Sequence, residues 1–167
     1  PPLVYKIRVA VAEWRDSGYH GASDTGKSLL NFWFNREHLI GQSQFGFFFA
    51  QREAIESIMY LYEVAKAKDK YELMRFDSSE RVSTGMFDET WTRYVVKMAT
   101  GTGKTKVMGL TLVWSYFHKR YETDSNLSKN FLVIAPNIIV LNRLRKDFDG
   151  LKMFFEEPFL PENGFDG

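Results

Sequence analysis

Residues 94–105 place a short apolar run directly before a glycine-rich segment, in the order Tyr-Val-Val-Lys-Met-Ala-Thr-Gly-Thr-Gly-Lys-Thr. A glycine-rich turn between a strand and a helix lets successive backbone N–H groups point at one anion, and the helix N-terminus adds positive potential. The segment therefore predicts a phosphate-binding loop for a nucleoside triphosphate. It also limits the fold, because such a loop requires a buried strand before it and a helix after it.

The residues of this loop have separate expected roles. Lys104 is expected to place its ammonium group on the outer phosphates of ATP, and Thr105 its hydroxyl on Mg²⁺. Gly101 and Gly103 permit backbone conformations and close approaches that a Cβ atom would obstruct. The nucleotide-binding residues predicted here are Ala99, Thr100, Gly101, Thr102, Gly103, Lys104 and Thr105.

A second segment competes for the same role. Residues 21–28, Gly-Ala-Ser-Asp-Thr-Gly-Lys-Ser, fit the pattern G-x-x-x-x-G-K-[ST] strictly, whereas residues 98–105 begin with methionine. The surroundings favour residues 98–105, because a polar, turn-like stretch precedes Gly21 and a β-branched strand precedes Thr100. We expect residues 21–28 to be a turn that opens a helix over residues 29–34.

The remaining patterns predict an α/β fold. Apolar residues at helical spacing follow Lys104, and residues 131–135 predict a second strand, so that strand, loop, helix and strand form a βαβ unit. Helices are also expected over residues 28–35, 50–66 and 137–148, whereas residues 6–12 fit a strand or a helix equally. These patterns indicate a mainly helical N-terminal segment over residues 1–49. Residues 50–167 would hold a partial P-loop domain with a parallel sheet and flanking helices, and residues 67–92 a surface insertion.

Two elements of a working ATPase are not apparent. A parallel sheet buried on both faces usually has about five or six strands, and only two are clear here. No apolar strand after the loop ends in an acidic residue that could hold Mg²⁺ and orient water. Asp147, Asp149, Glu156 and Glu157 are expected on solvated faces. We therefore expect a C-terminally incomplete part of a longer protein, inactive by itself.

Composition limits the partners that the chain is expected to bind. Twenty-two basic and 21 acidic residues give a net charge of +1, so nucleic-acid binding would need a local basic patch. The chain has no cysteine, and its three histidines lack metal-ligand spacing, which makes a zinc site unfavourable. No apolar run approaches the roughly 20 residues of a membrane span. These features predict a soluble cytoplasmic protein without membrane contact.

Three segments resemble motifs of one family. Met98-Ala-Thr-Gly-Thr-Gly-Lys-Thr105 resembles the first motif of superfamily-two helicases. Phe47-Phe-Phe-Ala-Gln-Arg-Glu-Ala-Ile55 is similar to the glutamine-bearing motif that precedes it, and residues 131–144, with Ala-Pro after an apolar run, are similar to the motif that follows. Together they most resemble the DEAD/DEAH-like helicase (Res) subunit of type III restriction enzymes.

The resemblance implies a RecA-like ATPase lobe of an ATP-hydrolysing helicase or translocase. It implies that Gln51 reads the adenine edge, and that Pro136, Asn137 and Arg143 contact the backbone of a nucleic acid, with duplex DNA as the track. A methyltransferase (modification) subunit would be a partner. The acidic motif, the Ser-Ala-Thr motif, the second lobe and any nuclease domain of the family are not apparent in this sequence.

Alternatives stay open for several of these residues. Gln51 fits equally a polar residue at a helix start. The aromatic residues Phe34, Phe45 and 47–49 could stack on a base, but a dense aromatic cluster is more often core. Arg143, with Arg145 and Lys146, could contact phosphates, but charged residues on a helix are more often simply solvated. A P-loop kinase or small NTPase that acts on a small molecule is the second functional candidate.

Overall fold

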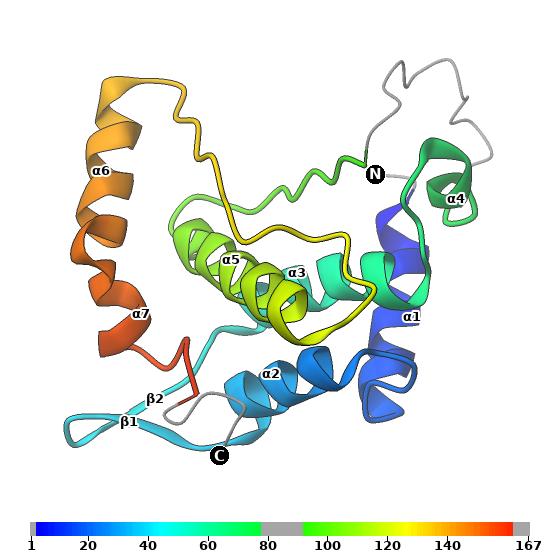
Figure 1. Cartoon of the computed structure of the whole chain (residues 1–167), viewed down its shortest axis with the longest axis horizontal. Coiled ribbons are helices and arrows are strands. Elements are labelled where there is room, and N and C mark those ends of the chain that lie inside the picture. The colour runs from blue at the N-terminus through cyan, green and yellow to red at the C-terminus, as the bar shows by residue number, and fades with distance from the viewer. Residues whose placement is uncertain (1–2, 78–91, 162–167) are drawn as a thin grey trace. The chain divides into compact units, whose positions relative to one another are not determined.

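The computed structural model describes residues 3–77 and 92–161 (Figure 1). These residues form two compact units. The first contains the described residues of Pro1–Ala22 and Glu53–Ala99, and the second those of Ser23–Arg52 and Thr100–Gly167. The predicted domain boundary lies after residue 49, and each unit contains segments from before and after that position. The boundary itself stays a prediction.

The first unit is helical. It contains α1 (Val4–Asp16), the part of α3 (Phe49–Met59) that follows Arg52, the π-helical turn η1 (Tyr60–Val64) and α4 (Lys70–Met74). Residues 6–12, which fitted a strand or a helix, are therefore helix. The apolar residues that this unit buries most completely are Val11, Trp14, Tyr19, Ile55, Met59, Leu61 and Ala67.

A buried ion pair joins α1 to α3 in this unit. The Glu56 side chain is fully buried, and the Arg15 guanidinium donates to both of its carboxylate oxygens, with Nε–O distances of 3.1 and 2.9 Å. The Tyr19 hydroxyl, itself buried, donates to Glu56 Oε1 at 2.7 Å. Hydrogen bonding to Glu56 raises the pKa of Arg15 above its ordinary value. The charges of Arg15 and Glu56 therefore compensate one another where water is largely excluded.

The two ends of the predicted insertion, residues 67–92, lie together. The Tyr94 hydroxyl donates to the Ala67 carbonyl at 2.9 Å, and the Thr92 hydroxyl donates to the Lys68 carbonyl at 2.8 Å. Burial raises the pKa of Tyr94 to about 12, and the nearby Tyr62 adds to the shift. The chain thus leaves and returns at one place, as an insertion requires. Helix α4 follows Asp69, and residues 78–91 of the predicted insertion lie outside the described part.

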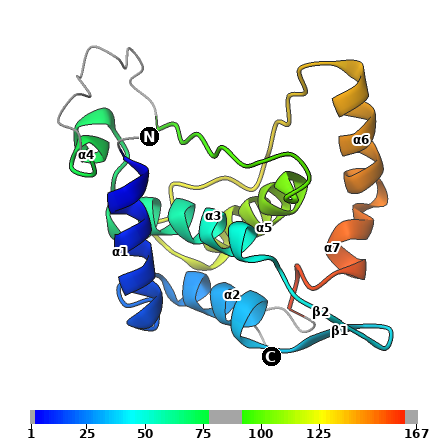
Figure 2. The same ribbon diagram turned by 180° about the vertical axis from the view of Figure 1, so that it is seen from behind.

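The second unit combines helices with a small hairpin. Helix α2 (Asp24–Asn35) leads into an antiparallel hairpin of β1 (His38–Ile40) and β2 (Ser43–Phe45). Helix α5 (Lys104–Tyr121) follows the glycine-rich loop, and α6 (Ile138–Phe148) continues through the 3₁₀ turn η3 (Asp149–Leu151) into α7 (Lys152–Glu156). Helices α2 and α5 pack against each other in both views (Figures 1 and 2).

Helix α5 is held along its length by other segments of the second unit. At its C-terminal end, Glu122 accepts the Thr25 backbone N–H at 3.0 Å. Partial burial alone would raise the pKa of Glu122, but its hydrogen bonds with Thr25 outweigh that effect and lower it. In the middle, a Cβ atom on Gly109 would lie 2.7 Å from Met153 and 2.8 Å from Phe159. Glycine at this position therefore allows the segment after α6 to approach α5 closely.

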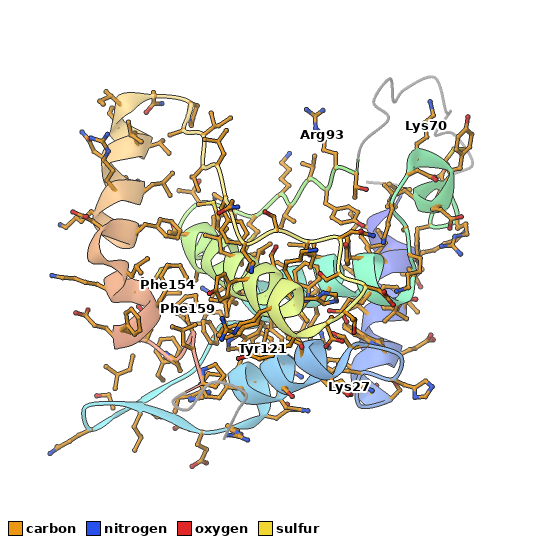
Figure 3. All side chains as sticks on the ribbon, in the orientation of Figure 1. Lys27, Lys70, Arg93, Tyr121, Phe154 and Phe159 are labelled. Carbon is orange, nitrogen blue, oxygen red and sulfur yellow. The ribbon has the colours of Figure 1, made fainter. Side chains whose placement is uncertain are left out.

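An aromatic cluster forms much of the second unit's core. Its rings make edge-to-face or tilted contacts at centroid distances between 5.1 and 5.8 Å. The fully buried Phe159 lies beside Phe154, as Figure 3 shows, and its carbonyl accepts the Trp33 indole N–H at 2.9 Å. The members are Phe34, Phe45, Phe47, Phe148, Phe154 and Phe159. The core alternative is therefore confirmed for the half-buried Phe34, Phe45 and Phe47. It is wrong for Phe48 and Phe49, which are exposed.

The described residues show no parallel sheet. Residues 93–97 and 131–135 have no regular secondary structure, and the β1–β2 hairpin is the only sheet within residues 3–77 and 92–161. Val95 is 87% exposed and Leu132 85%. A strand needs a neighbour that completes its hydrogen-bond ladder, and an apolar sequence pattern cannot supply one. The helices expected over residues 28–35, 50–66 and 137–148 are confirmed, although the second ends in a π-helical turn.

Candidate nucleotide-binding loop

The loop over residues 100–105 has the backbone geometry that its glycines predicted. Gly101 has a φ of +81° and Gly103 a φ of +82°, and residues with a Cβ atom rarely adopt these backbone angles. Gly103 is the left-handed N-cap of α5, so Lys104 and Thr105 occupy its first turn. The Lys104 side chain is exposed and that of Thr105 is half-buried. Both residues are thus placed at the positive end of an 18-residue helix.

The first hydrogen bonds of α5 begin beyond these two residues. The Lys106 N–H donates to the Gly103 carbonyl at 2.9 Å, and the Val107 N–H donates to the same oxygen at 3.2 Å. The N–H groups of Lys104 and Thr105 precede these bonds, as expected for the first turn of a helix. The segment therefore has the composition and the backbone form of an anion-binding helix start. Ala99, the first predicted member of the site, is exposed and belongs to the other unit.

Gln51 lies against this loop. Its side chain is 1% exposed, and its Nε2 donates to the Thr102 carbonyl at 3.0 Å. Its Oε1 accepts the Phe48 backbone N–H at 2.9 Å. Phe48 precedes the first residue of α3, so the second bond is the glutamine half of a capping box. The helix-start alternative for Gln51 is thereby confirmed, whereas its contact with adenine stays a prediction.

The first turn of α5 also carries an ion pair that the sequence did not reveal. Lys106 Nζ donates to Glu157 Oε2, and both side chains are about one-quarter exposed. The same ammonium group lies 5.1 Å from the centroid of the Phe45 ring. Glu157 was expected on a solvated face, and that expectation is wrong. Because 51 positions separate the partners, no local pattern in the sequence could have paired them.

The competing motif at residues 21–28 has a different structure. Ser23 is the N-cap of α2, and its hydroxyl accepts the Gly26 N–H at 2.9 Å. The Lys27 N–H donates to the Ser23 carbonyl at 2.9 Å. Gly26 and Lys27 are thus helical, and their N–H groups are already hydrogen-bonded to the N-cap residue Ser23. Figure 3 shows Lys27 on α2. The expectation that this segment opens a helix is confirmed.

The residues predicted to contact nucleic acid lie at and after the N-terminus of α6. Asn137 is the N-cap, and its Oδ1 accepts the Val140 N–H at 3.0 Å. Pro136, Asn137 and Arg143 are all exposed. The last turn of α6 contains Arg145 and Lys146, which extend the basic surface that begins at Arg143. The helix buries none of its residues completely, and Arg143, Arg145 and Lys146 are all exposed.

The described residues contain neither a metal-binding cluster nor a membrane-spanning helix. Within residues 3–77 and 92–161, no three His, Asp or Glu side chains are grouped so that they could hold a metal ion. His118 is buried and hydrogen-bonds the Ser125 hydroxyl at 2.7 Å, and His38 bonds the Phe32 carbonyl. None of the helices in this part combines the length and the apolar character needed to cross a bilayer.

Comparison with known proteins identifies a family. Residues 44–164 match the family model described as "Type III restriction enzyme, res subunit". No curated protein and no solved structure matches the chain. The matched range contains Gln51, the loop over residues 100–105 and the N-cap Asn137, whereas the competing motif at residues 21–28 lies outside it.

Proposed function

The chain belongs to the family of type III restriction enzyme res subunits, and from this premise we propose that it is the ATP-binding part of a nucleic-acid-dependent motor. The full-length protein would be an ATP-hydrolysing helicase or translocase. The observation that carries the proposal is the loop over residues 100–105, with left-handed glycines at 101 and 103 and a long helix starting at Lys104. This arrangement supports binding of a triphosphate through backbone N–H groups and the Lys104 ammonium.

We further propose the division of roles within the site. Residues 99–103 surround the phosphates with backbone N–H groups, and Lys104 neutralises the outer phosphates. Thr105, in the first turn of α5, would offer its hydroxyl oxygen to Mg²⁺, and the bound ion would supply positive charge that neutralises the phosphates. A hydroxyl oxygen is a suitable donor for this hard cation.

The complete lobe would be RecA-like, in keeping with the family. The exposed apolar segments over residues 93–97 and 131–135 support strands that pair in the full-length protein, where a parallel sheet would cover Val95 and Leu132. Residues 67–92 would then be an insertion between Gln51 and the phosphate loop, supported by the hydrogen bonds that join its two ends. The acidic motif and the second lobe would lie elsewhere in the complete protein.

DNA is the proposed track, and a modification (methyltransferase) subunit a proposed partner. A helix N-terminus offers N–H donors to a phosphate, and Asn137 already orients this end of α6. Pro136 precedes the cap, and Arg143 follows nearly two turns later on an exposed face. Such contacts position the backbone of a nucleic acid and carry no base information. Family membership favours this motor over a small-molecule kinase.

We expect the double variant Asn137→Ala, Arg143→Ala to lower DNA-stimulated ATP hydrolysis by the full-length protein without changing its affinity for ATP. Removal of phosphate contacts should weaken DNA binding about equally on all sequences and reduce the slope of log affinity against log salt by about 1 per contact. Steady-state ATPase assays over a DNA titration, repeated at several salt concentrations, measure both effects.

The matched control is Asn142→Ala with Lys152→Ala, which also removes one exposed amide and one exposed positive charge. Circular dichroism would check that all variants are folded. If DNA stimulates ATP hydrolysis equally in the test variant and in the control, this end of α6 does not contact the nucleic acid. ATP hydrolysis that never responds to DNA or RNA would instead favour the small-molecule NTPase.

A further inference from the structure

The Gln51 amide connects two backbone groups, because it accepts from one and donates to the other. The Phe48 N–H can only donate and the Thr102 carbonyl can only accept, so Oε1 must face Phe48 and Nε2 must face Thr102. We propose that Gln51 is a positioning residue, which acts through Thr102 to hold the phosphate loop in its binding shape. This inference rests on the proposed nucleotide-binding function of that loop.

Peptide geometry explains how a bond to Thr102 controls the loop. The Thr102 carbonyl and the Gly103 N–H belong to one planar trans peptide unit, so they point in opposite directions. Gln51 fixes the carbonyl on its own side and thereby directs the Gly103 N–H away from itself. That N–H is one of the donors proposed for the phosphates. Rotation of the peptide unit would turn the carbonyl oxygen toward the anion and repel it.

The close packing of Gln51 on Gly103 supports the same role. A Cβ atom built on Gly103 would clash with Gln51 Nε2 and would lie 3.2 Å from its Cδ. Glycine is therefore required at position 103 both for its φ of +82° and for the approach of this amide. The buried side chain leaves the peptide unit little freedom to rotate. The capping bond to Phe48 in turn anchors the amide to the start of α3.

The positioning role and the predicted adenine contact differ in one measurable respect. If Gln51 orients the loop, its loss weakens binding of any ligand with a triphosphate group, whatever the base. If Gln51 reads adenine, its loss weakens ATP alone and reduces the preference for ATP over GTP. Inorganic tripolyphosphate, which has no base, separates the two roles directly.

The first test variant is Gln51→Glu, which is nearly the same size. Its added negative charge can itself repel phosphates, so the result is compared with that of the neutral variant Gln51→Asn. Its carboxylate can still accept the Phe48 N–H and cap α3, but it cannot donate to the Thr102 carbonyl. We expect the affinities for Mg²⁺-bound ATP, GTP and tripolyphosphate to fall by the same factor, about tenfold, with the ATP-to-GTP ratio unchanged. Isothermal titration calorimetry on the protein and its variant measures all three affinities.

Gln51→Asn provides an independent test, because its amide keeps both groups but is one methylene too short to reach both partners. The same uniform loss is expected, and this variant decides the matter if Gln51→Glu does not fold. Gln44→Glu, at an exposed glutamine of β2, is the matched control and should bind all three ligands normally. Thermal unfolding midpoints would show whether a loss of binding reflects a loss of fold.

Three results would overturn the inference. A loss confined to ATP would assign Gln51 to the adenine, with the proposed function intact. Unchanged affinities in both Gln51 variants would show that the loop holds its shape without this amide. If the unaltered protein binds none of the three ligands, the proposed function fails, and the positioning role fails with it.

Discussion

Replacement of Lys104 with alanine should abolish detectable binding of ATP, whereas Lys27→Ala should leave binding intact. Lys104 lies in the first turn of α5, directly after the left-handed Gly103. There its ammonium group would add to the helix N-terminus in neutralising the outer phosphates. A hydrogen bond to a charged group contributes about 1.5–3 kcal/mol, which is roughly a tenfold to hundredfold change in affinity.

We expect the loss to be complete because ATP binding is expected to be weak before the substitution. Residues 3–77 and 92–161 include no second lobe that could close on the nucleotide. We therefore expect weak binding and no appreciable turnover, and a further loss brings binding below detection. Calorimetric titration of Mg²⁺-ATP into the protein and both variants measures the difference.

Lys27→Ala is a stringent control because Lys27 occupies the lysine position of a stricter sequence motif. The N–H groups of Gly26 and Lys27 are bonded to Ser23, so this segment has no loop in which to hold a phosphate. The choice between the two motifs would be wrong if Lys27→Ala abolished binding and Lys104→Ala preserved it.

The second large effect concerns stability. Glu56→Ala should lower the free energy of unfolding by about 3 kcal/mol, near the lower end of the cost of breaking a buried ion pair. The substitution removes the carboxylate that accepts hydrogen bonds from the Arg15 guanidinium and from the buried Tyr19 hydroxyl. The cost is not higher because the Arg15 side chain is 21% exposed and can reach water. Urea denaturation followed by circular dichroism measures the change.

Glu53→Ala is the matched control on the same helix. Glu53 pairs with Arg8 at 2.8 Å, but the Arg8 side chain is 55% exposed, and such surface pairs contribute about 0–1 kcal/mol. A destabilisation by Glu56→Ala no larger than that by Glu53→Ala would show that the buried network does not hold the first unit together. Glu56→Gln, which keeps the shape and removes the charge, should fall between the two.

The sequence by itself determined the features that depend on a few neighbouring residues. The glycines at positions 101 and 103 predicted the loop, and the lysine and threonine after them predicted the start of α5. The helix predicted over residues 137–148 has its N-cap at Asn137, whose side chain caps an N–H three residues ahead. Capping bonds and left-handed glycine turns are complete within about four residues, so a local pattern contains all their partners.

Tertiary structure decided the features whose partners are distant in the chain. The Gln51 amide meets Thr102 across 51 positions, and Arg15 meets Glu56 across 41. The sequence offered two equal roles for Gln51, and the fold showed that this side chain contacts both a helix start and the glycine-rich loop. The predicted strands depend on distant partners in the same way, since residues 93–97 and 131–135 have strand composition but no regular secondary structure. A hydrogen-bond ladder depends on which chain lies alongside, and only the folded arrangement decides that.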